Sequence, residues 1–251
     1  MYDKHVLSIF ASGLYKYAEL DIYIVHFGNR INIDVLLFDS LDKETEIITP
    51  VLTFATTLAP IIQLGFVPNF IDCGQNTFNI DVDLIEKSIT KNTKAIMVPN
   101  LIGNLADWPK LREIASMHNL ILIEDSADTI GSTLGQKTTG FYSDLSTTSF
   151  YASHIITGAG FGGMVTTNND QIYKNLLLLR GWGRESSLIG ETEDIYTRTK
   201  SYLDNIQYDS KFIFSKLGYN FLPSEISAAF ALEQTKKLDR KSTRLNSSHG
   251  Y

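Results

Sequence analysis

The sequence has little cysteine, no excess of basic residues and no long apolar run, and each absence excludes a class of protein. Cys73 is the one cysteine among 251 residues, which excludes an internal disulfide framework and any metal site built from several cysteines of this chain. Lys and Arg number 22 against 28 Asp and Glu, so nucleic acid is not an expected partner. Apolar runs end well short of the roughly 20 residues of a membrane helix, and no signal peptide opens the chain. We therefore expect a cytoplasmic protein without a membrane partner.

The composition that remains is that of an ordinary globular protein. Hydrophobic residues make up 43% and charged residues 20% of the chain, which excludes a disordered, collagen-like or coiled-coil protein. This length fits one large α/β domain or two small ones, and it allows a sizeable core.

The last residues differ abruptly from the rest. Residues 240–251 follow an amphipathic helical run and contain one aliphatic side chain, that of Leu245. They resemble translated sequencing-adaptor sequence, and a native polar linker is the alternative. We expect residues 1–239 to form the domain, residues 240–251 to be a non-native tail, and the natural protein to continue beyond this point.

Short β-branched runs alternate with helical patterns along the chain before this tail. Strands are expected at residues 46–50, 66–72, 94–99, 120–124, 145–151 and 163–167. Helices are expected at residues 54–64, 82–88, 108–118 and 225–238, with Lys174 and Arg180 as solvated charges of a further helical run. Apolar strands separated by helices predict an α/β fold whose mostly parallel sheet is covered on both faces. Ligands of such sheets bind beyond the carboxyl ends of the strands.

Several of the expected strand ends carry polar or glycine-rich motifs, and each has an ordinary alternative. Glu124 and Asp125 end an apolar strand, where they could simply cap a following helix. Residues 158–163 are rich in glycine, which marks a tight turn more often than a phosphate site. His154 lies in a polar context and could be an ordinary histidine, either on the surface or with its hydrogen bonds satisfied.

Taken together and in this order, the motifs resemble the DegT/DnrJ group of sugar aminotransferases, which are fold-type I pyridoxal-phosphate enzymes. The resemblance covers residues 46–238, and its matching segments are residues 48–57, 81–88, 94–99, 124–128, 149–151 and 217–220. It implies the large domain of a fold-type I enzyme, α/β with a mixed, mostly parallel sheet between helices. The smaller C-terminal domain of that fold would be missing.

The resemblance also implies pyridoxal or pyridoxamine 5′-phosphate as cofactor and assigns residues to it. Asp125 matches the aspartate that keeps the ring nitrogen protonated, and Asp128 stands where the aminotransferases have a glutamine near the ring hydroxyl. Phe54 matches the aromatic residue on which the ring stacks, although a core phenylalanine is the alternative. Ser149 matches a phosphate-binding serine.

Two further segments are assigned by the same resemblance. Asn220 matches an asparagine that reaches the phosphate of the neighbouring subunit, which implies a homodimer with shared sites. The early phosphate loop of the family is altered at residues 26–32, where Gly28 and Asn29 could still offer backbone N–H groups.

The position five residues after Ser149 separates the activities within the family. The aminotransferases have a lysine there that forms a Schiff base with the cofactor, whereas this chain has His154, whose imidazole can move protons but forms no stable Schiff base. A histidine at this position resembles the nucleotide-sugar 3-dehydratases, which make 3-deoxysugars from 4-keto-6-deoxyhexoses. The resemblance therefore makes His154 the catalytic residue.

The dehydratase subgroup has two branches. One holds an iron–sulfur cluster on cysteines after a Trp-Gly-Arg motif, but residues 185–209 contain no cysteine, so neither a cluster nor another metal is expected. The other branch is cluster-free and recharges its cofactor with an amino donor such as glutamate; this sequence is compatible with that branch, and an external reductase is the alternative. We thus expect a dehydratase acting on a nucleotide-linked 4-keto-6-deoxy sugar in deoxysugar biosynthesis. A sugar aminotransferase with changed catalysis and a non-catalytic protein of this fold are the alternatives.

Overall fold

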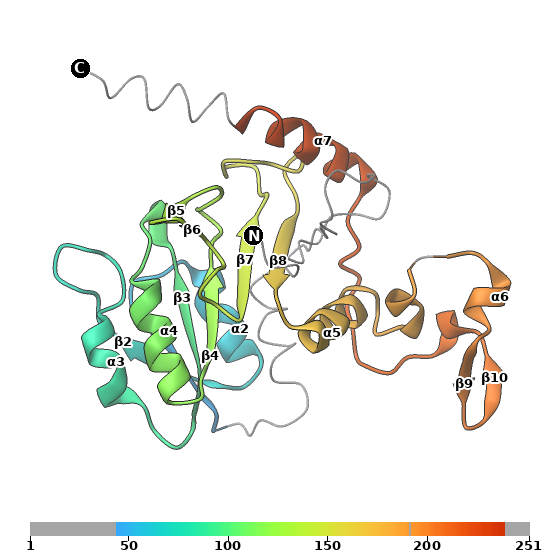
Figure 1. The fold of residues 1–251 in the computed structure, drawn as a ribbon, viewed down its shortest axis with the longest axis horizontal. Helices are drawn as coiled ribbons and strands as arrows, with labels where there is room; N and C mark the ends of the chain where they lie inside the picture. The colour runs from blue at the N-terminus through green and yellow to red at the C-terminus, as the bar shows by residue number, and fades with distance from the viewer. Residues whose placement is uncertain (1–43, 191, 239–251) are drawn as a thin grey trace.

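A six-stranded sheet forms the centre of the computed structural model, which describes residues 44–190 and 192–238 (Figure 1). The strands lie in the order β2-β1-β3-β4-β7-β8, and all neighbours are parallel except β7 and β8. They are β1 (Glu46–Pro50), β2 (Val67–Ile71), β3 (Thr93–Pro99), β4 (Ile121–Asp125), β7 (Leu145–Ser149) and β8 (Gly163–Thr167). The expected mixed, mostly parallel α/β sheet is confirmed.

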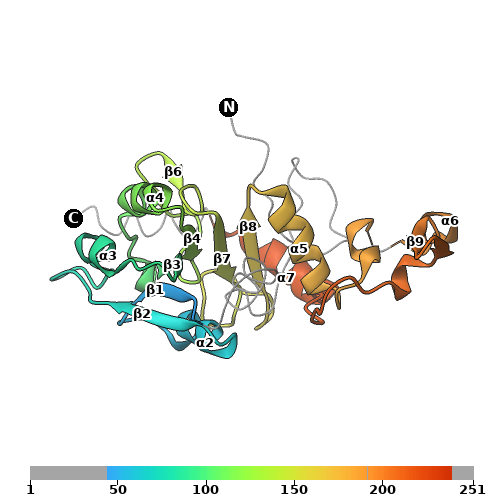
Figure 2. The same ribbon diagram turned by 90° about the horizontal axis from the view of Figure 1, so that it is seen from below.

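Helices cover both faces of this sheet. The α-helices are α2 (Ala55–Gln63), α3 (Val82–Ser88), α4 (Trp108–Met117), α5 (Asp170–Arg180), α6 (Ile195–Arg198) and α7 (Glu225–Thr235). Figure 2 shows α3 and α4 on one face and α2 on the other. The helix expected from the acidic start at Asp81 is confirmed, because this side chain accepts a hydrogen bond from the Asp83 N–H group and caps α3.

Strand alternation explains the two cores. Ile96 and Leu122 face α4, where they belong to one apolar cluster with Trp108. Their strand neighbours point the other way, and Ile123 clusters with Ile61 of α2. Each residue of β4 is therefore assigned to one face by its position in the strand.

The remaining elements are short. Two hairpins, β5 (Thr133–Leu134) with β6 (Lys137–Thr138) and β9 (Ser201–Leu203) with β10 (Ile206–Tyr208), accompany the 3₁₀-helices η1 (Leu101–Gly103), η2 (Glu185–Leu188) and η3 (Ser210–Phe212). Figure 1 shows α6, β9 and β10 projecting away from the sheet. None of the helices in the described ranges is long and apolar enough to cross a membrane.

One expectation about α5 is wrong. Lys174 is exposed as expected, but Arg180 is buried, with 5% of its surface accessible. The reason is that a later segment of the chain crosses the last turn of α5, where the Phe221 N–H group donates to the Arg180 carbonyl at 2.9 Å. Helical periodicity alone did not reveal that crossing.

Candidate active site

The candidate site lies where β1, β3, β4 and β7 end, which we call the carboxyl edge of the sheet. The last residues of β4 and β7 are Asp125 and Ser149, and β8 begins at the same edge because Gly163 pairs with Ser149. Two of the residues singled out in the sequence thus end strands that are direct neighbours. Such an edge is where parallel sheets bind ligands.

Asp125 is held in place by groups from two elements. It is 5% exposed and points to the α2 face, where Thr57 Oγ1 donates to its Oδ2 at 2.8 Å. The N–H group of Ala127 donates to its Oδ1 at 3.2 Å. No helix follows β4, so the helix-capping alternative for Asp125 is wrong. The structure presents a buried carboxylate with fixed orientation at the strand end.

Phe54 stands at the start of α2, one helical turn before Thr57. It is the N-cap residue of this helix, and its carbonyl accepts the Thr57 N–H group at 3.0 Å. The residue is 69% exposed, so the alternative of a core phenylalanine is wrong. The same helix start thus places a hydroxyl on Asp125 and an aromatic ring in the open.

Ser149 and His154 occupy the beginning of the loop between β7 and β8. Ser149 Oγ accepts the Tyr151 N–H group at 3.2 Å, and the His154 N–H group donates to the Tyr151 carbonyl at 3.0 Å. The loop packs against helix α7, because Phe150 and Ile156 are buried in one apolar cluster with residues of this helix. This packing fixes the turn that carries His154.

The structure brings His154 to Asp128 from the loop after β4. Nε2 of His154 lies 3.6 Å from Oδ1 of Asp128, while Oδ2 of Asp128 accepts the Ile102 N–H group at 3.2 Å. Nδ1 of His154 is buried and has no hydrogen-bond partner among the residues that the structure describes. His154 is therefore not an ordinary surface histidine, and its Nε2 is the nitrogen that faces an acidic group.

Glu124 precedes Asp125 but points to the opposite face of the sheet. It is 1% exposed, and Asn100, Ser126, Ser143 and the backbone of Gly140 all donate hydrogen bonds to its carboxyl group. Burial raises the pKa of Glu124 above its ordinary value, and these donors oppose the rise. The sequence did not predict this network or the role of Thr57. The signal that could have indicated the network was the acidic residue Glu124 inside an apolar strand.

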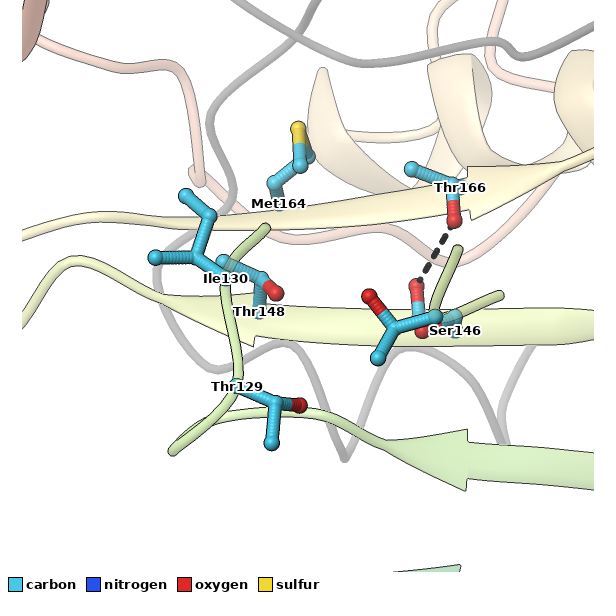
Figure 3. A pocket seen from close by; sticks show the side chains of 7 residues that line it. Thr129, Ile130, Ser146, Thr148, Met164 and Thr166 are labelled. Carbon is cyan, nitrogen blue, oxygen red and sulfur yellow. Dashed lines mark hydrogen bonds between the residues drawn. The ribbon is translucent and has the colours of Figure 1, made fainter. Parts of the chain in front are cut away.

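A small cavity of about 70 Å³ lies on this second face (Figure 3). Its lining comes from the loop after β4, the turn after β6, and strands β7 and β8: Thr129, Ile130, Thr139, Ser146, Thr148, Met164 and Thr166. Pairing of Ser146 with Glu124 places the cavity opposite Asp125. It has room for a few water molecules, whereas cofactor sites measure about 300–1,000 Å³.

Asn220 is placed differently from the other predicted residues. It is exposed, and it pairs through its backbone with Gly181 at the end of α5. The next turn supports this pairing, because the Trp182 N–H group donates to the Tyr219 carbonyl at 2.8 Å. The chain segment that bears Asn220 is thus clamped against residues 181–184.

The other predicted features are a glycine-rich turn and segments that lie outside the described residues. Gly28, Asn29 and the tail of residues 240–251 fall in the undescribed ranges. The glycine-rich residues 158–163 form a turn in which the Gly158 N–H group donates to the Phe150 carbonyl at 2.9 Å. Within residues 44–190 and 192–238, no three His, Cys, Asp or Glu side chains are grouped as metal ligands.

With this geometry in view, comparison with known proteins identifies the family. The sequence profile of the DegT/DnrJ/EryC1/StrS aminotransferase family matches residues 32–249. The chain belongs to this family. A dTDP-4-dehydro-2,6-dideoxy-D-glucose 3-dehydratase of Saccharopolyspora spinosa is 37% identical over 77% of the chain and 42% of the relative.

Solved structures of this family share the fold. A GDP-4-keto-6-deoxy-D-mannose 3-dehydratase of E. coli with bound hydrated PLP matches with a TM-score of 0.75 at 32% identity, over 86% of the chain and 56% of the relative. A GDP-4-keto-6-deoxymannose 3-dehydratase with a trapped PLP–glutamate adduct matches with the same TM-score at 30% identity, again over 86% and 56%. The fold-type I assignment is confirmed. The chain spans about half the length of these relatives.

Proposed function

We propose that this chain is the cofactor-binding domain of a dehydratase that removes the C3 hydroxyl group of a nucleotide-linked 4-keto-6-deoxyhexose. The observation that carries the proposal is the position of His154. It replaces the lysine of the aminotransferases, and it lies at the carboxyl edge with Nε2 beside Asp128. Because the histidine side chain has no primary amine to form a Schiff base with the cofactor, His154 disfavours the aminotransferase alternative.

The residues at the carboxyl edge fit pyridoxal or pyridoxamine 5′-phosphate. The buried carboxylate of Asp125 would bind the ring nitrogen, the exposed ring of Phe54 would stack on the cofactor, and Ser149 Oγ would bind the phosphate. When bound in its pyridoxamine form, this cofactor would supply an electron-withdrawing ring that makes the proton on its own C4′ acidic, and the electron pair released there would expel the C3 hydroxyl group of the substrate. The retained contacts also speak against a non-catalytic protein.

His154 supplies the proton chemistry in this proposal. Its imidazole would take up and return the proton that the elimination requires, because this ring can act as both base and acid. Asp128 would hold the ring by its contact with Nε2, rather than bind the cofactor hydroxyl as the resemblance implies. The Tyr151 carbonyl fixes the backbone of His154 in the same turn.

The partners follow from the relatives. One acts on a dTDP-linked and one on a GDP-linked keto sugar, so we propose the shared 4-keto sugar part as the substrate class. The structure with glutamate supports glutamate as amino donor. The exposed Asn220 supports a homodimer in which it reaches the partner's phosphate site, and we propose that the protein acts in the cytoplasm without an iron–sulfur cluster.

Replacement of His154 by Asn tests this function. We expect H154N to keep the cofactor and to lose the 3-deoxy product, measured by NMR with GDP- and dTDP-linked 4-keto-6-deoxy sugars and glutamate. The matched control is H118N, because His118 pairs with Glu86 between α3 and α4, away from the carboxyl edge. It should retain activity.

Borohydride reduction gives an independent test. The loaded protein should show no cofactor mass on any lysine peptide. A lysine adduct or an active H154N variant would refute the proposal, and a 4-amino sugar product would identify an aminotransferase instead.

A further inference from the structure

Glu124 is a buried acidic residue that the proposed chemistry does not use. Its Oε1 accepts Asn100 Nδ2 at 2.9 Å and Ser126 Oγ at 2.6 Å. Its Oε2 accepts the Gly140 N–H group at 2.8 Å and Ser143 Oγ at 3.2 Å. Four donors from three loops therefore meet one carboxyl group at the carboxyl edge.

The directions of these donors require two acceptor oxygens. Asn100 cannot reverse its amide, because its Oδ1 already accepts Trp108 Nε1 at 2.7 Å and the Ala106 N–H group at 3.3 Å. The Gly140 N–H group is part of the backbone and is equally fixed. A glutamine in place of Glu124 would put its NH₂ group against one of these two donors in either orientation. A protonated glutamic acid would keep a lone pair on both oxygens, so only the amide is excluded.

Two of the loops held in this way lead directly to Asp128. Asn100 immediately precedes η1, whose Ile102 N–H group donates to Oδ2 of Asp128. Ser126 begins the turn that contains Asp128, closed by a hydrogen bond of 3.1 Å from the Thr129 N–H group to the Ser126 carbonyl. Glu124 Oε1 thus binds both the turn that carries Asp128 and the turn that holds its carboxyl group.

We propose that Glu124 is a positioning residue that acts through Asp128: by joining these two turns it places Asp128 Oδ1 beside Nε2 of His154. The inference rests on the proposed function, in which His154 moves the proton. Glu124 itself lies on the other face of β4 and would touch neither substrate nor cofactor.

The contact is tested first without cofactor or substrate. The ring signals of His154, assigned with H154N, are followed by NMR in the full chain. We expect E124Q to shift them in the same direction as D128N. The control is E46Q, because Glu46 Oε2 also accepts hydroxyl and amide donors, such as Thr90 Oγ1 at 2.8 Å, but lies at the first residue of β1, far from the carboxyl edge. It should leave the His154 signals unchanged.

A double-mutant cycle then tests whether Glu124 acts through Asp128. A misplacement of about 1 Å costs up to about 100-fold in rate, so we expect E124Q to lower kcat tenfold to 100-fold with little change in KM. The variant E124Q/D128N should be no slower than D128N alone, since both changes remove the same contact. E46Q should keep the wild-type kcat.

Several results would overturn the proposal. Unchanged His154 signals in E124Q would do so, and so would losses in E124Q and D128N that multiply in the double variant. If E124Q does not fold, S143A removes one of the four donors and should shift the same signals less; no shift in folded S143A would equally overturn it. If the wild-type chain binds neither pyridoxal nor pyridoxamine 5′-phosphate, the proposed function fails while the NMR arm still decides the role of Glu124.

Discussion

The hydrogen bond from Thr57 to Asp125 allows a prediction whose sign can be worked out from the structure. Thr57 is fully buried, Asp125 is 5% exposed, and Oγ1 lies 2.8 Å from Oδ2. The substitution Thr57→Val keeps the shape of the side chain and removes the donor. A hydrogen bond to a charged group contributes about 1.5–3 kcal/mol. Burial of the methyl group that replaces the hydroxyl stabilises the folded state by about 0.8 kcal/mol at most.

We therefore expect T57V to lower the free energy of unfolding by about 1–2 kcal/mol. For a chain of this size, that corresponds to a Tm lower by about 2–8 °C. Urea unfolding followed by far-UV circular dichroism, with the m value checked for each protein, measures the difference. The Ala127 N–H group still donates to Asp125 in the variant, so the loss should not be larger.

Thr49→Val is the matched control for this measurement. Thr49 is also fully buried, but its Oγ1 has no hydrogen-bond partner among the described residues. Removing an unpaired buried hydroxyl should leave stability unchanged or raise it. If T57V proves as stable as T49V, the hydrogen bond to Asp125 does not hold the carboxylate as described.

Two further predictions concern other parts of the molecule. Because burial raises the pKa of Glu124, the folded chain keeps this proton to a higher pH than the unfolded chain, and the stabilisation from this group is lost as pH rises above 4.5. We therefore expect the difference in the free energy of unfolding between wild type and E124Q, measured in urea between pH 4.5 and 7, to narrow as pH rises. A difference that stays constant with pH would contradict this prediction. Gly183→Ala should lower the Tm more than Gly135→Ala. Both glycines have positive φ, but a Cβ atom at Gly183 would lie 1.8 Å from the Lys216 carbonyl oxygen, whereas a Cβ atom at Gly135 would have open space. Equal losses of Tm would show that the segment around Lys216 moves to make room for the Cβ atom.

The sequence predicted the central sheet well because its strands are short apolar runs bounded by clear turn residues. It did not predict the two hairpins, whose strands have only two or three residues and therefore show no periodicity. Arg180 was misjudged for a related reason: the segment that buries it lies about 40 residues later in the chain, and helical periodicity carries no information about such contacts.

The candidate site divides in the same way. Asp125, Phe54, Ser149 and His154 were assigned by the resemblance to the family, within motifs that lie at or near the expected strand ends. The partners that orient them were not, because Thr57 is 68 positions from Asp125, and no spacing rule connects them. The contact between His154 and Asp128 likewise depends on two loops that only the fold brings together.

The two acidic residues that end β4 show how one strand separates structural support from chemistry. The sequence alone does not distinguish the roles of Glu124 and Asp125, and either could have been a helix cap. Strand alternation sends Asp125 to the α2 face, where the Thr57 hydroxyl and the Ala127 N–H group donate to it. It sends Glu124 to the α4 face, into a set of donors that are themselves fixed.

The consequence is that different substitutions affect these two neighbouring carboxylates. A change at Thr57 reaches the face on which we propose the cofactor ring to bind, whereas a change at Glu124 reaches Asp128 and His154 through the two turns it joins. No side chain is shared between the hydrogen bonds described above for Asp125 and those described for Glu124, so we expect T57V and E124Q to combine additively. Coupling between T57V and E124Q in urea unfolding would mean that β4 transmits strain between its faces, and that the two carboxylates form one unit.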